Sequence, residues 1–167
     1  MAVRAALPED WERIRDVRLA ALRDAPDAFS STLEGSEGQP QWRWEGWATG
    51  EGWGATVATF VEEPRPGAGF TALATAAAFK DDPRVVHLFA MWVAPEARRS
   101  GIGRELVERV VSWAAESGAA EVFLRVTEGN DVAARLYRAC GFVLDAEDRE
   151  PLREGSALEI LGMRRTL

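Results

Sequence analysis

The segment from Arg98 to Arg104, Arg-Arg-Ser-Gly-Ile-Gly-Arg, has the residue types of an anion-binding turn. An apolar, strand-like run, Val85–Val93, precedes it, and a helix-like apolar pattern follows it. A strand that turns into a helix through glycines directs several backbone N–H groups at one point, where the helix dipole adds partial positive charge. Gly101 and Gly103 let the backbone approach an anion closely. The pattern therefore predicts a pyrophosphate site formed by Arg98, Arg99, Ser100, Gly101, Ile102, Gly103 and Arg104.

Two common phosphate-binding motifs do not fit these residues. A dinucleotide fingerprint needs a third glycine where the chain has Leu106, and an acidic residue about twenty positions further on. A P-loop needs Gly-Lys-Ser or Gly-Lys-Thr, and the sequence contains neither triplet. Nucleotide binding of either kind is therefore disfavoured. For this segment taken alone, an ordinary strand-to-helix turn remains the alternative.

A second segment, Asn130–Phe142, has the features of a short helix with defined ends. Asn130 is a favourable N-cap, and Gly141 suits the left-handed residue that follows a helix. Because Asn130 and Tyr137 lie seven residues apart, they project from one helix face, with roughly 10 Å between them along the axis.

Together the two segments resemble the GCN5-related N-acetyltransferase (GNAT) superfamily. The first matches the family's acetyl-CoA signature Arg/Gln-x-x-Gly-x-Gly/Ala, and the second matches Asn-x-x-Ala-x-x-Leu-Tyr-x-x-x-Gly-Phe at every fixed position. The resemblance implies acetyl-CoA as the cofactor and an α/β (α+β) fold. That fold has a central mixed, mostly antiparallel seven-stranded sheet with helices on both faces, in the order β-α-α-β-β-β-α-β-α-β-β. The resemblance covers nearly the whole chain, so a single acetyltransferase domain is expected over residues 1–167.

The resemblance also implies roles for individual residues. Asn130 and Ala133 occupy positions that hold the pantetheine arm of the cofactor. The same arm is hydrogen-bonded where two parallel strands splay apart after a bulge, here by backbone groups of Met91, Trp92 and Val93. The oxyanion formed during acyl transfer also needs donors, and a backbone N–H near Met91 to Val93 would serve. Tyr137 occupies the position of the tyrosine that protonates the leaving sulfur, the alternative being an amphipathic core residue whose hydroxyl only finds a partner.

The base that deprotonates the amine is left open by the sequence. Many family members carry a glutamate in the fourth strand, about where this chain has His87. A histidine with an unperturbed pKa near 6.5 suits a base at neutral pH. The alternatives are that His87, the only histidine, is a core or rim residue and that water takes the proton.

The rest of the chain supplies the elements that position these residues. A strand at 3–7 leads into a first helix whose apolar stripe contains Ile14, Val17, Ala21 and Leu22. A polar loop is expected to run to Pro40, before a short helix at 41–48. A helix at 101–117 provides the crossover that the parallel strands 85–93 and 121–127 require. The other strands are expected at 55–62, 70–79, 142–146 and 157–165, with a charged loop at 148–155 between the last two.

Composition and charge narrow the class of protein. The 167 residues are 47% hydrophobic and 28% charged, which is ordinary for one globular domain. The net charge of −7 disfavours a nucleic-acid partner, which would require a basic face. No signal peptide and no bilayer-spanning run are apparent, so a cytoplasmic location without membrane association is expected. The single Cys140 excludes an internal disulfide and gives no metal cluster, so no metal is expected.

The predicted function is transfer of the acetyl group of acetyl-CoA to a primary amine by direct attack in a ternary complex. A small-molecule amine is the favoured acceptor; a protein or peptide acceptor and a non-catalytic acyl-CoA-binding sensor are the alternatives. The intact Tyr137 argues against a sensor. Acids and aromatics in the acceptor region could hold an ammonium group, with core packing as the alternative: Glu34, Glu37, Trp42, Trp44, Trp47, Glu51 and Trp53. A homodimer is common in the family.

Overall fold

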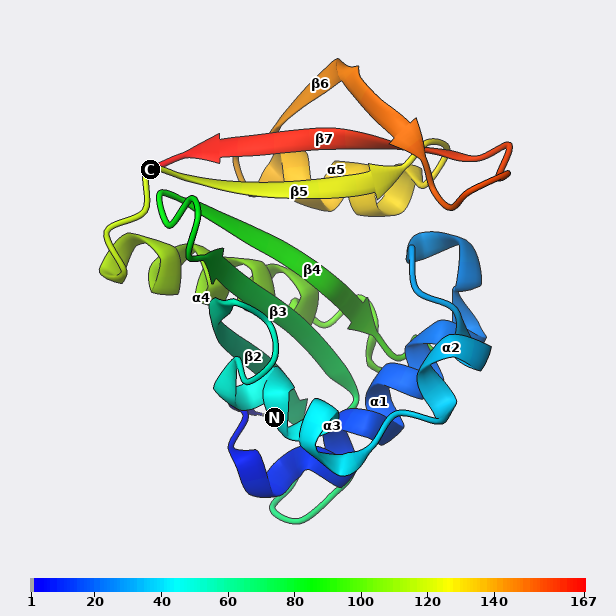
Figure 1. The fold of residues 1–167 in the computed structure, drawn as a ribbon, viewed down its shortest axis with the longest axis vertical. Helices are drawn as coiled ribbons and strands as arrows, with labels where there is room; N and C mark the ends of the chain where they lie inside the picture. The colour runs from blue at the N-terminus through cyan, green and yellow to red at the C-terminus, as the bar shows by residue number, and fades with distance from the viewer. Residues whose placement is uncertain (1) are drawn as a thin grey trace.

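The computed structural model describes residues 2–167, and its seven strands join in one sheet (Figure 1). The strands are β1 (Ala2–Ala5), β2 (Ala55–Glu63), β3 (Ala72–Phe79), β4 (Val85–Val93), β5 (Glu121–Thr127), β6 (Val143–Pro151) and β7 (Glu159–Thr166). The helices are α1 (Trp11–Asp24), α2 (Leu33–Glu37), α3 (Gln41–Thr49), α4 (Ile102–Glu116) and α5 (Asp131–Ala139). In the spatial order β1-β2-β3-β4-β5-β7-β6, the pair β4–β5 is parallel and the other neighbouring pairs are antiparallel. The predicted mixed, mostly antiparallel seven-stranded sheet is confirmed.

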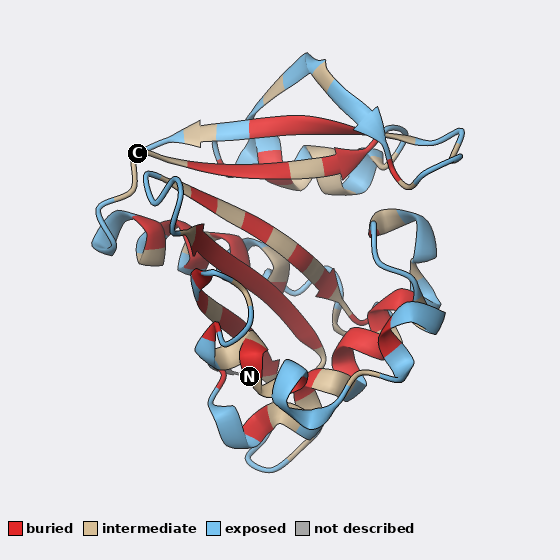
Figure 2. Ribbon diagram, in the orientation of Figure 1, coloured by how far each residue is buried: buried red, intermediate tan, exposed pale blue. Residues whose placement is uncertain are grey.

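Helices cover both faces of this sheet, as predicted. On one face, α4 buries an apolar stripe that includes Leu106 and Val110. On the other, α1 and α3 bury Ile14, Leu22 and Trp44. Strand β3, which is mostly alanine, is buried over 72–78 (Figure 2). Its small side chains allow helices to pack closely on both faces of the central sheet.

Two segments differ from the sequence prediction. The loop expected to run to Pro40 contains α2, a short helix whose N-cap Thr32 accepts a hydrogen bond from the Gly35 N–H at 3.1 Å. The expected element order therefore gains one helix. Strand β6 continues to Pro151 through part of the predicted charged loop, because β7 pairs with it again after a register shift between Asp145 and Arg149. As an exposed edge strand, β6 lacks the apolar alternation that marks a half-buried strand.

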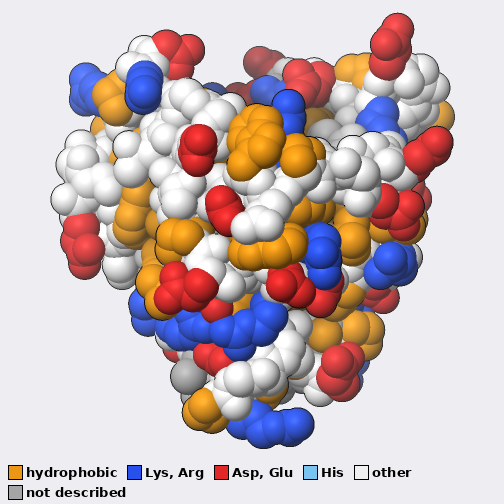
Figure 3. All heavy atoms as spheres, turned by 60° about the horizontal axis from the view of Figure 1, so that its bottom comes forward, with side chains coloured by type: hydrophobic (Ala, Val, Ile, Leu, Met, Phe, Trp, Pro, Cys, Tyr) orange, Lys and Arg blue, Asp and Glu red, His pale blue; other side chains and the backbone are white. Residues whose placement is uncertain are grey.

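On the face that Figure 3 shows, acidic, basic and apolar side chains are interspersed, and neither sign of charge covers it. Within residues 2–167, no helix combines the length and the apolar character needed to cross a membrane. The same part of the chain contains no group of three or more His, Cys, Asp or Glu side chains placed to hold a metal ion.

Candidate active site

Strands β4 and β5 are paired only near their beginnings and then diverge. The parallel ladder ends at His87 and Phe123, and Figure 1 shows the two strands separating toward their C-terminal ends. Beyond His87, the edge of β4 that faces β5 has no strand neighbour among the described residues. Its backbone N–H and C=O groups are therefore available to another partner.

A β-bulge changes which way the end of β4 faces. The register with β3 shifts between Leu73 and Thr75, and Ala90 has a φ of 57°. Before the bulge, Leu88 packs on the α4 side of the sheet. After it, Trp92 packs on the α1 side, while Met91 packs on the α4 side. The bulge therefore brings Met91 next to the beginning of α4.

The glycine turn before α4 has the geometry of an anion-binding helix start. Gly101 is the N-cap of α4, with a φ of 85° in the left-handed region. A Cβ on Gly103 would lie 3.2 Å from Leu136 Cδ2 and 3.4 Å from Met91 Cε, so a side chain there would press on both neighbours. The first N–H groups of α4 have no acceptor within the helix. Together with the helix dipole, they suit a phosphate group.

The arginines of this turn differ in their environment. Arg98 donates a hydrogen bond from Nε to the Val93 carbonyl at 2.9 Å and another from Nη2 to Asp24 at 2.7 Å. Asp24 also accepts a hydrogen bond from the Trp92 indole at 2.9 Å. The hydrogen bonds from Trp92 and then from Arg98 lower the pKa of the Asp24 carboxyl. All three arginines are exposed, and Arg98 is the one whose hydrogen bonds fix the turn against β4 and α1.

Helix α5 presents the second predicted motif. Asn130 caps this helix, and its side-chain oxygen accepts a hydrogen bond from the Ala133 N–H at 3.4 Å. Tyr137 follows two helical turns after the cap, on the same helix face. The motif therefore places all three residues along one wall.

One cavity of about 750 Å³, which we call the cofactor cavity, brings together almost all the predicted cofactor residues. This volume lies within the ~300–1,000 Å³ typical of small-molecule sites. Ser100 does not line the cavity; its hydroxyl donates a hydrogen bond to the Ala97 carbonyl at 2.5 Å. The predicted residues that line it are Met91, Trp92, Val93, Arg98, Arg99, Gly101, Ile102, Gly103, Arg104, Asn130, Ala133 and Tyr137.

Several other residues of this wall were not identified from the sequence: Asp24, Ala25, Ala28, Phe29, Ala97, Val132 and Leu136. Val132 is 73% exposed. An apolar residue on α5 outside the core is the feature that could have identified it as a wall residue. The residues at 24–29 come from the segment after α1, and no local pattern links that segment to β4 or α5.

Tyr137 joins the cofactor cavity to a second one. Its side chain is only 6% exposed and lines both the cofactor cavity and a cavity of about 200 Å³, the middle cavity. Burial raises the pKa of the Tyr137 hydroxyl well above its usual value. The phenol therefore keeps its proton at neutral pH and can act as a proton donor.

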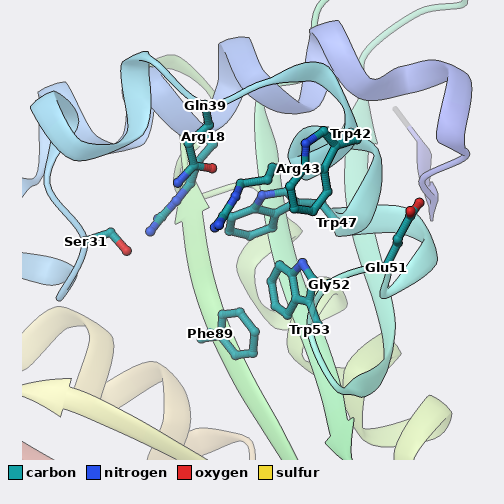
Figure 4. Close-up of a pocket in the computed structure, with 10 residues that line it drawn as sticks. All are labelled: Arg18, Ser31, Gln39, Trp42, Arg43, Trp47, Glu51, Gly52, Trp53 and Phe89. Atoms are coloured by element: carbon teal, nitrogen blue, oxygen red, sulfur yellow. The ribbon is translucent and has the colours of Figure 1, made fainter.

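A third cavity of about 240 Å³, the aromatic cavity, lies beyond the middle one (Figure 4). The middle and aromatic cavities share Arg18, Ser31 and Phe89 as wall residues. The cofactor and middle cavities likewise share four wall residues, Ala28, Phe29, Met91 and Tyr137. The shared walls place the three cavities in series. Four rings face the aromatic cavity, those of Trp42, Trp47, Trp53 and Phe89.

The residues predicted to hold the acceptor are only partly gathered here. Trp42, Trp47, Glu51 and Trp53 line the aromatic cavity. Trp44 is buried in the core, and Glu34 and Glu37 are exposed on α2, outside all three cavities. Figure 4 shows the Glu51 carboxylate pointing away from the other labelled side chains. The predicted carboxylates therefore do not converge on one ammonium site.

His87 lies outside the three cavities. Its ring packs edge-on against Phe79 and Phe123, with centroids 5.2 Å and 5.5 Å away. Burial lowers the pKa of the His87 imidazole below its usual value. This position does not support the prediction of His87 as the base and agrees with the alternative of a core or rim residue.

Comparison with known proteins identifies the family of the chain. A family model described as the acetyltransferase (GNAT) family matches residues 19–142. Mycothiol acetyltransferase of Kocuria rhizophila is 37% identical over 62 residues, which are 37% of this chain and 20% of that protein. Streptothricin acetyltransferase of Streptomyces lavendulae is 40% identical over 67 residues, which are 40% of this chain and 35% of that protein. The chain therefore spans only a fifth to about a third of the length of these curated relatives.

Solved structures resemble the whole chain. Ribosomal-protein-alanine N-acetyltransferase from Brucella melitensis has a TM-score of 0.76 at 22% identity, covering 100% of both chains. The Salmonella typhimurium protein yncA, solved with its cofactor acetyl-CoA, has a TM-score of 0.76 at 22% identity, covering 100% of this chain and 94% of that one. These similarities confirm the predicted fold. The family match over most of its length shows that the chain belongs to the GNAT family of acetyltransferases, enzymes for which acetyl-CoA is the acetyl donor.

Proposed function

We propose that the protein is a cytoplasmic enzyme that transfers the acetyl group of acetyl-CoA to a primary amine of a small molecule. The observation that carries this proposal is that Tyr137 lines both the cofactor cavity and the middle cavity. A donor in the first cavity and an acceptor in the second would meet at this hydroxyl. Because both must be bound for this meeting, the amine attacks directly in a ternary complex.

The walls of the cofactor cavity fit coenzyme A. The N–H groups at the start of α4, with Arg99 and Arg104 beside them, would bind the pyrophosphate. The free edge of β4 would hydrogen-bond the pantetheine amides through Met91–Val93, as a neighbouring strand does. Asn130 and Ala133 would hold the same arm from α5. Acetyl-CoA supplies the acetyl thioester.

Acetyl transfer forms a C–N bond and breaks the C–S bond, so a negative charge must be stabilised on the carbonyl oxygen and then on sulfur. A backbone N–H within Met91–Val93 is the donor that we assign to the carbonyl oxygen. Tyr137 holds a proton on its hydroxyl because burial disfavours the phenolate. We assign to Tyr137 the transfer of this proton to the leaving sulfur.

The amine must lose a proton, and the middle cavity contains no side chain suited to take it. None of the described residues that line this cavity is an Asp, a Glu or a His. His87 faces Phe79 and Phe123 instead. We therefore assign the removal of this proton to water.

The size of the acceptor site supports a small molecule. The middle and aromatic cavities measure about 200 and 240 Å³, below the ~300–1,000 Å³ of drug-sized ligand sites. The names of the two curated relatives, mycothiol acetyltransferase and streptothricin acetyltransferase, also refer to small molecules.

The test is release of free thiol from acetyl-CoA with polyamines, amino acids, aminoglycosides and short peptides, with the acetylated product identified by mass spectrometry. We expect release with one small-molecule class. Release with peptides alone would replace the small-molecule acceptor by a protein. No thiol release with any compound of the panel, while acetyl-CoA still binds, would favour a non-catalytic sensor.

A further inference from the structure

Arg18 occupies a position in α1 where the sequence pattern calls for an apolar residue. Ile14, Val17, Ala21 and Leu22 form the buried stripe of this helix, and Arg18 lies among them at the same helical spacing. Its side chain is accordingly buried, with only 5% exposed. A charged side chain at such a position is costly unless something pairs with it.

In the described part of the chain, no carboxylate forms an ion pair with Arg18. Its Nη1 atom is buried without a hydrogen-bond partner among residues 2–167. Burial alone lowers the pKa of Arg18 to about 10, so the guanidinium is still charged at neutral pH. Aromatic faces give partial compensation, since the guanidinium carbon lies 4.5 Å from the Phe29 ring centroid and 5.4 Å from that of Trp47.

The other arginine of the middle cavity is different. Arg125 forms an ion pair with Asp148 at 3.1 Å and another with Glu150. Its charge is therefore already balanced within the protein. The Nε atom of Arg125 is also buried without a hydrogen-bond partner. Of the two arginines that line the middle cavity, Arg18 is nevertheless the one whose charge has no carboxylate partner among residues 2–167.

Arg18 also lies where an acceptor must pass. It lines the middle cavity together with Tyr137, and it lines the aromatic cavity together with Trp42 and Trp53. Figure 4 shows its guanidinium reaching down from α1 toward Ser31. An acceptor whose amine approaches Tyr137 would place its next functional group near Arg18 because the shared cavity is small.

We propose that the acceptor is an amino acid whose free carboxylate is bound by Arg18, with its side chain directed toward the aromatic cavity. The planar guanidinium matches a carboxylate through two parallel hydrogen bonds. This pairing would supply the partner that the buried charge lacks. A polyamine would instead bring positive charge against Arg18 and the nearby Arg43. The inference rests on the proposed acetyl transfer and names its acceptor class.

The test compares amino acids with their carboxamides and decarboxylated amines: tryptophan, leucine and alanine, each beside its amide and its amine. Thiol release is measured for each compound. We expect the amino acids to exceed their neutral partners at least about tenfold in kcat/KM, as the loss of a charge-assisted hydrogen bond would give. Equal rates, or faster amides, would overturn the inference and leave the proposed acetyl transfer standing.

Three variants locate the preference. Arg18→Met should remove the difference between acids and amides, and Arg18→Lys should retain part of it, because a lysine keeps the charge and loses the planar fork. Arg15→Met is the matched control, since Arg15 is on the same helix, pairs with Asp16 and lines none of the cavities. Arg15→Met should keep the wild-type ratio of kcat/KM between acids and amides. If that ratio were also unchanged in Arg18→Met, the assignment of Arg18 would be contradicted.

Two further readouts separate this inference from the alternatives. If Arg18 were only structural, Arg18→Met would lower the thermal midpoint of unfolding and would lower kcat/KM equally for all compounds. We expect no drop in the midpoint, because the substitution removes an unpaired buried charge. If no compound is acetylated, the proposed function fails, and binding decides the inference. Titration with leucine and alanine, with coenzyme A present and followed by the fluorescence of the protein's tryptophans, should then show Arg18-dependent binding, and absence of binding would overturn the inference.

Discussion

The indole of Trp92 donates a hydrogen bond of 2.9 Å to the carboxylate of Asp24, which ties the end of β4 to the end of α1. The same carboxylate oxygen accepts a hydrogen bond of 2.7 Å from Arg98. One side chain therefore holds both the strand edge assigned to pantetheine and the turn assigned to pyrophosphate. These two parts of the cofactor cavity depend on a residue that is distant from both in the sequence.

Replacing Asp24 should weaken acetyl-CoA binding. Asp24→Ala removes the shared acceptor and frees both Trp92 and Arg98, so we expect the Kd for acetyl-CoA to rise about tenfold, as the loss of a charge-assisted hydrogen bond would give. Isothermal titration calorimetry measures this Kd. Asp27→Ala, which removes a carboxylate that is 69% exposed, serves as control and should bind normally. An unchanged Kd in Asp24→Ala would show that the contact does not position the cavity.

A charge at Gly103 should block the cofactor cavity. Because a Cβ at this position would already lie 3.2 Å from Leu136, Gly103→Glu directs a carboxylate into the space assigned to an anion. We expect acetyl-CoA binding to be lost while the circular dichroism spectrum is retained. Gly69→Glu is the matched control, since a Cβ there meets no atom within 4 Å. Retained binding in Gly103→Glu would place the cofactor elsewhere.

The two motifs could be predicted because each is local. The glycine turn with α4, and the capped helix α5, are each specified by residues within one or two helical turns. The family resemblance implies a bulge before the strands splay apart, but its position at Ala90 was not predicted, since it depends on pairing with β3 rather than on the sequence of β4. The contact of Asp24 with Trp92 joins residues 68 positions apart, which no local pattern reveals. Arg18 is recognisable in the sequence as a charged residue within an apolar stripe, but the sequence does not identify its partner.

The position of His87 predicts that it takes no part in proton transfer. In His87→Gln, we expect the acid limb of the pH profile of kcat/KM to keep its midpoint, because water removes the amine proton. The rate can change through packing against Phe79 and Phe123, whereas the midpoint cannot. A flattened or shifted acid limb would restore His87 as the base.

Asp10 should make the stability of the fold depend on pH. This carboxylate is 3% exposed; burial would raise its pKa, but hydrogen bonds from Arg4, the Leu7 N–H and Arg13 lower it to about 2. Because the folded pKa is below the unfolded value of about 3.9, the stabilisation is complete above that value and is lost as the pH falls toward 2.

Asp10→Asn should therefore lower the free energy of unfolding by about 1–2 kcal/mol at pH 7, and by progressively less below pH 4. Urea unfolding at pH 7, 4 and 3 measures the difference. Asp16→Asn, at a carboxylate that is 66% exposed, should have little effect at any of these pH values. If Asp10→Asn lowered the free energy of unfolding as much at pH 3 as at pH 7, the link between the lowered pKa of Asp10 and stability would be refuted.

The most direct test of the proposed mechanism is the kcat of Tyr137→Phe, measured with saturating acetyl-CoA and the acceptor found in the panel. The substitution removes only the hydroxyl of a side chain that lines both the cofactor and middle cavities. We expect kcat to fall at least about 100-fold, the contribution typical of a general acid, while the Kd for acetyl-CoA stays unchanged. A kcat equal to that of the wild type would contradict the account, because the proton for the leaving sulfur would then come from another source.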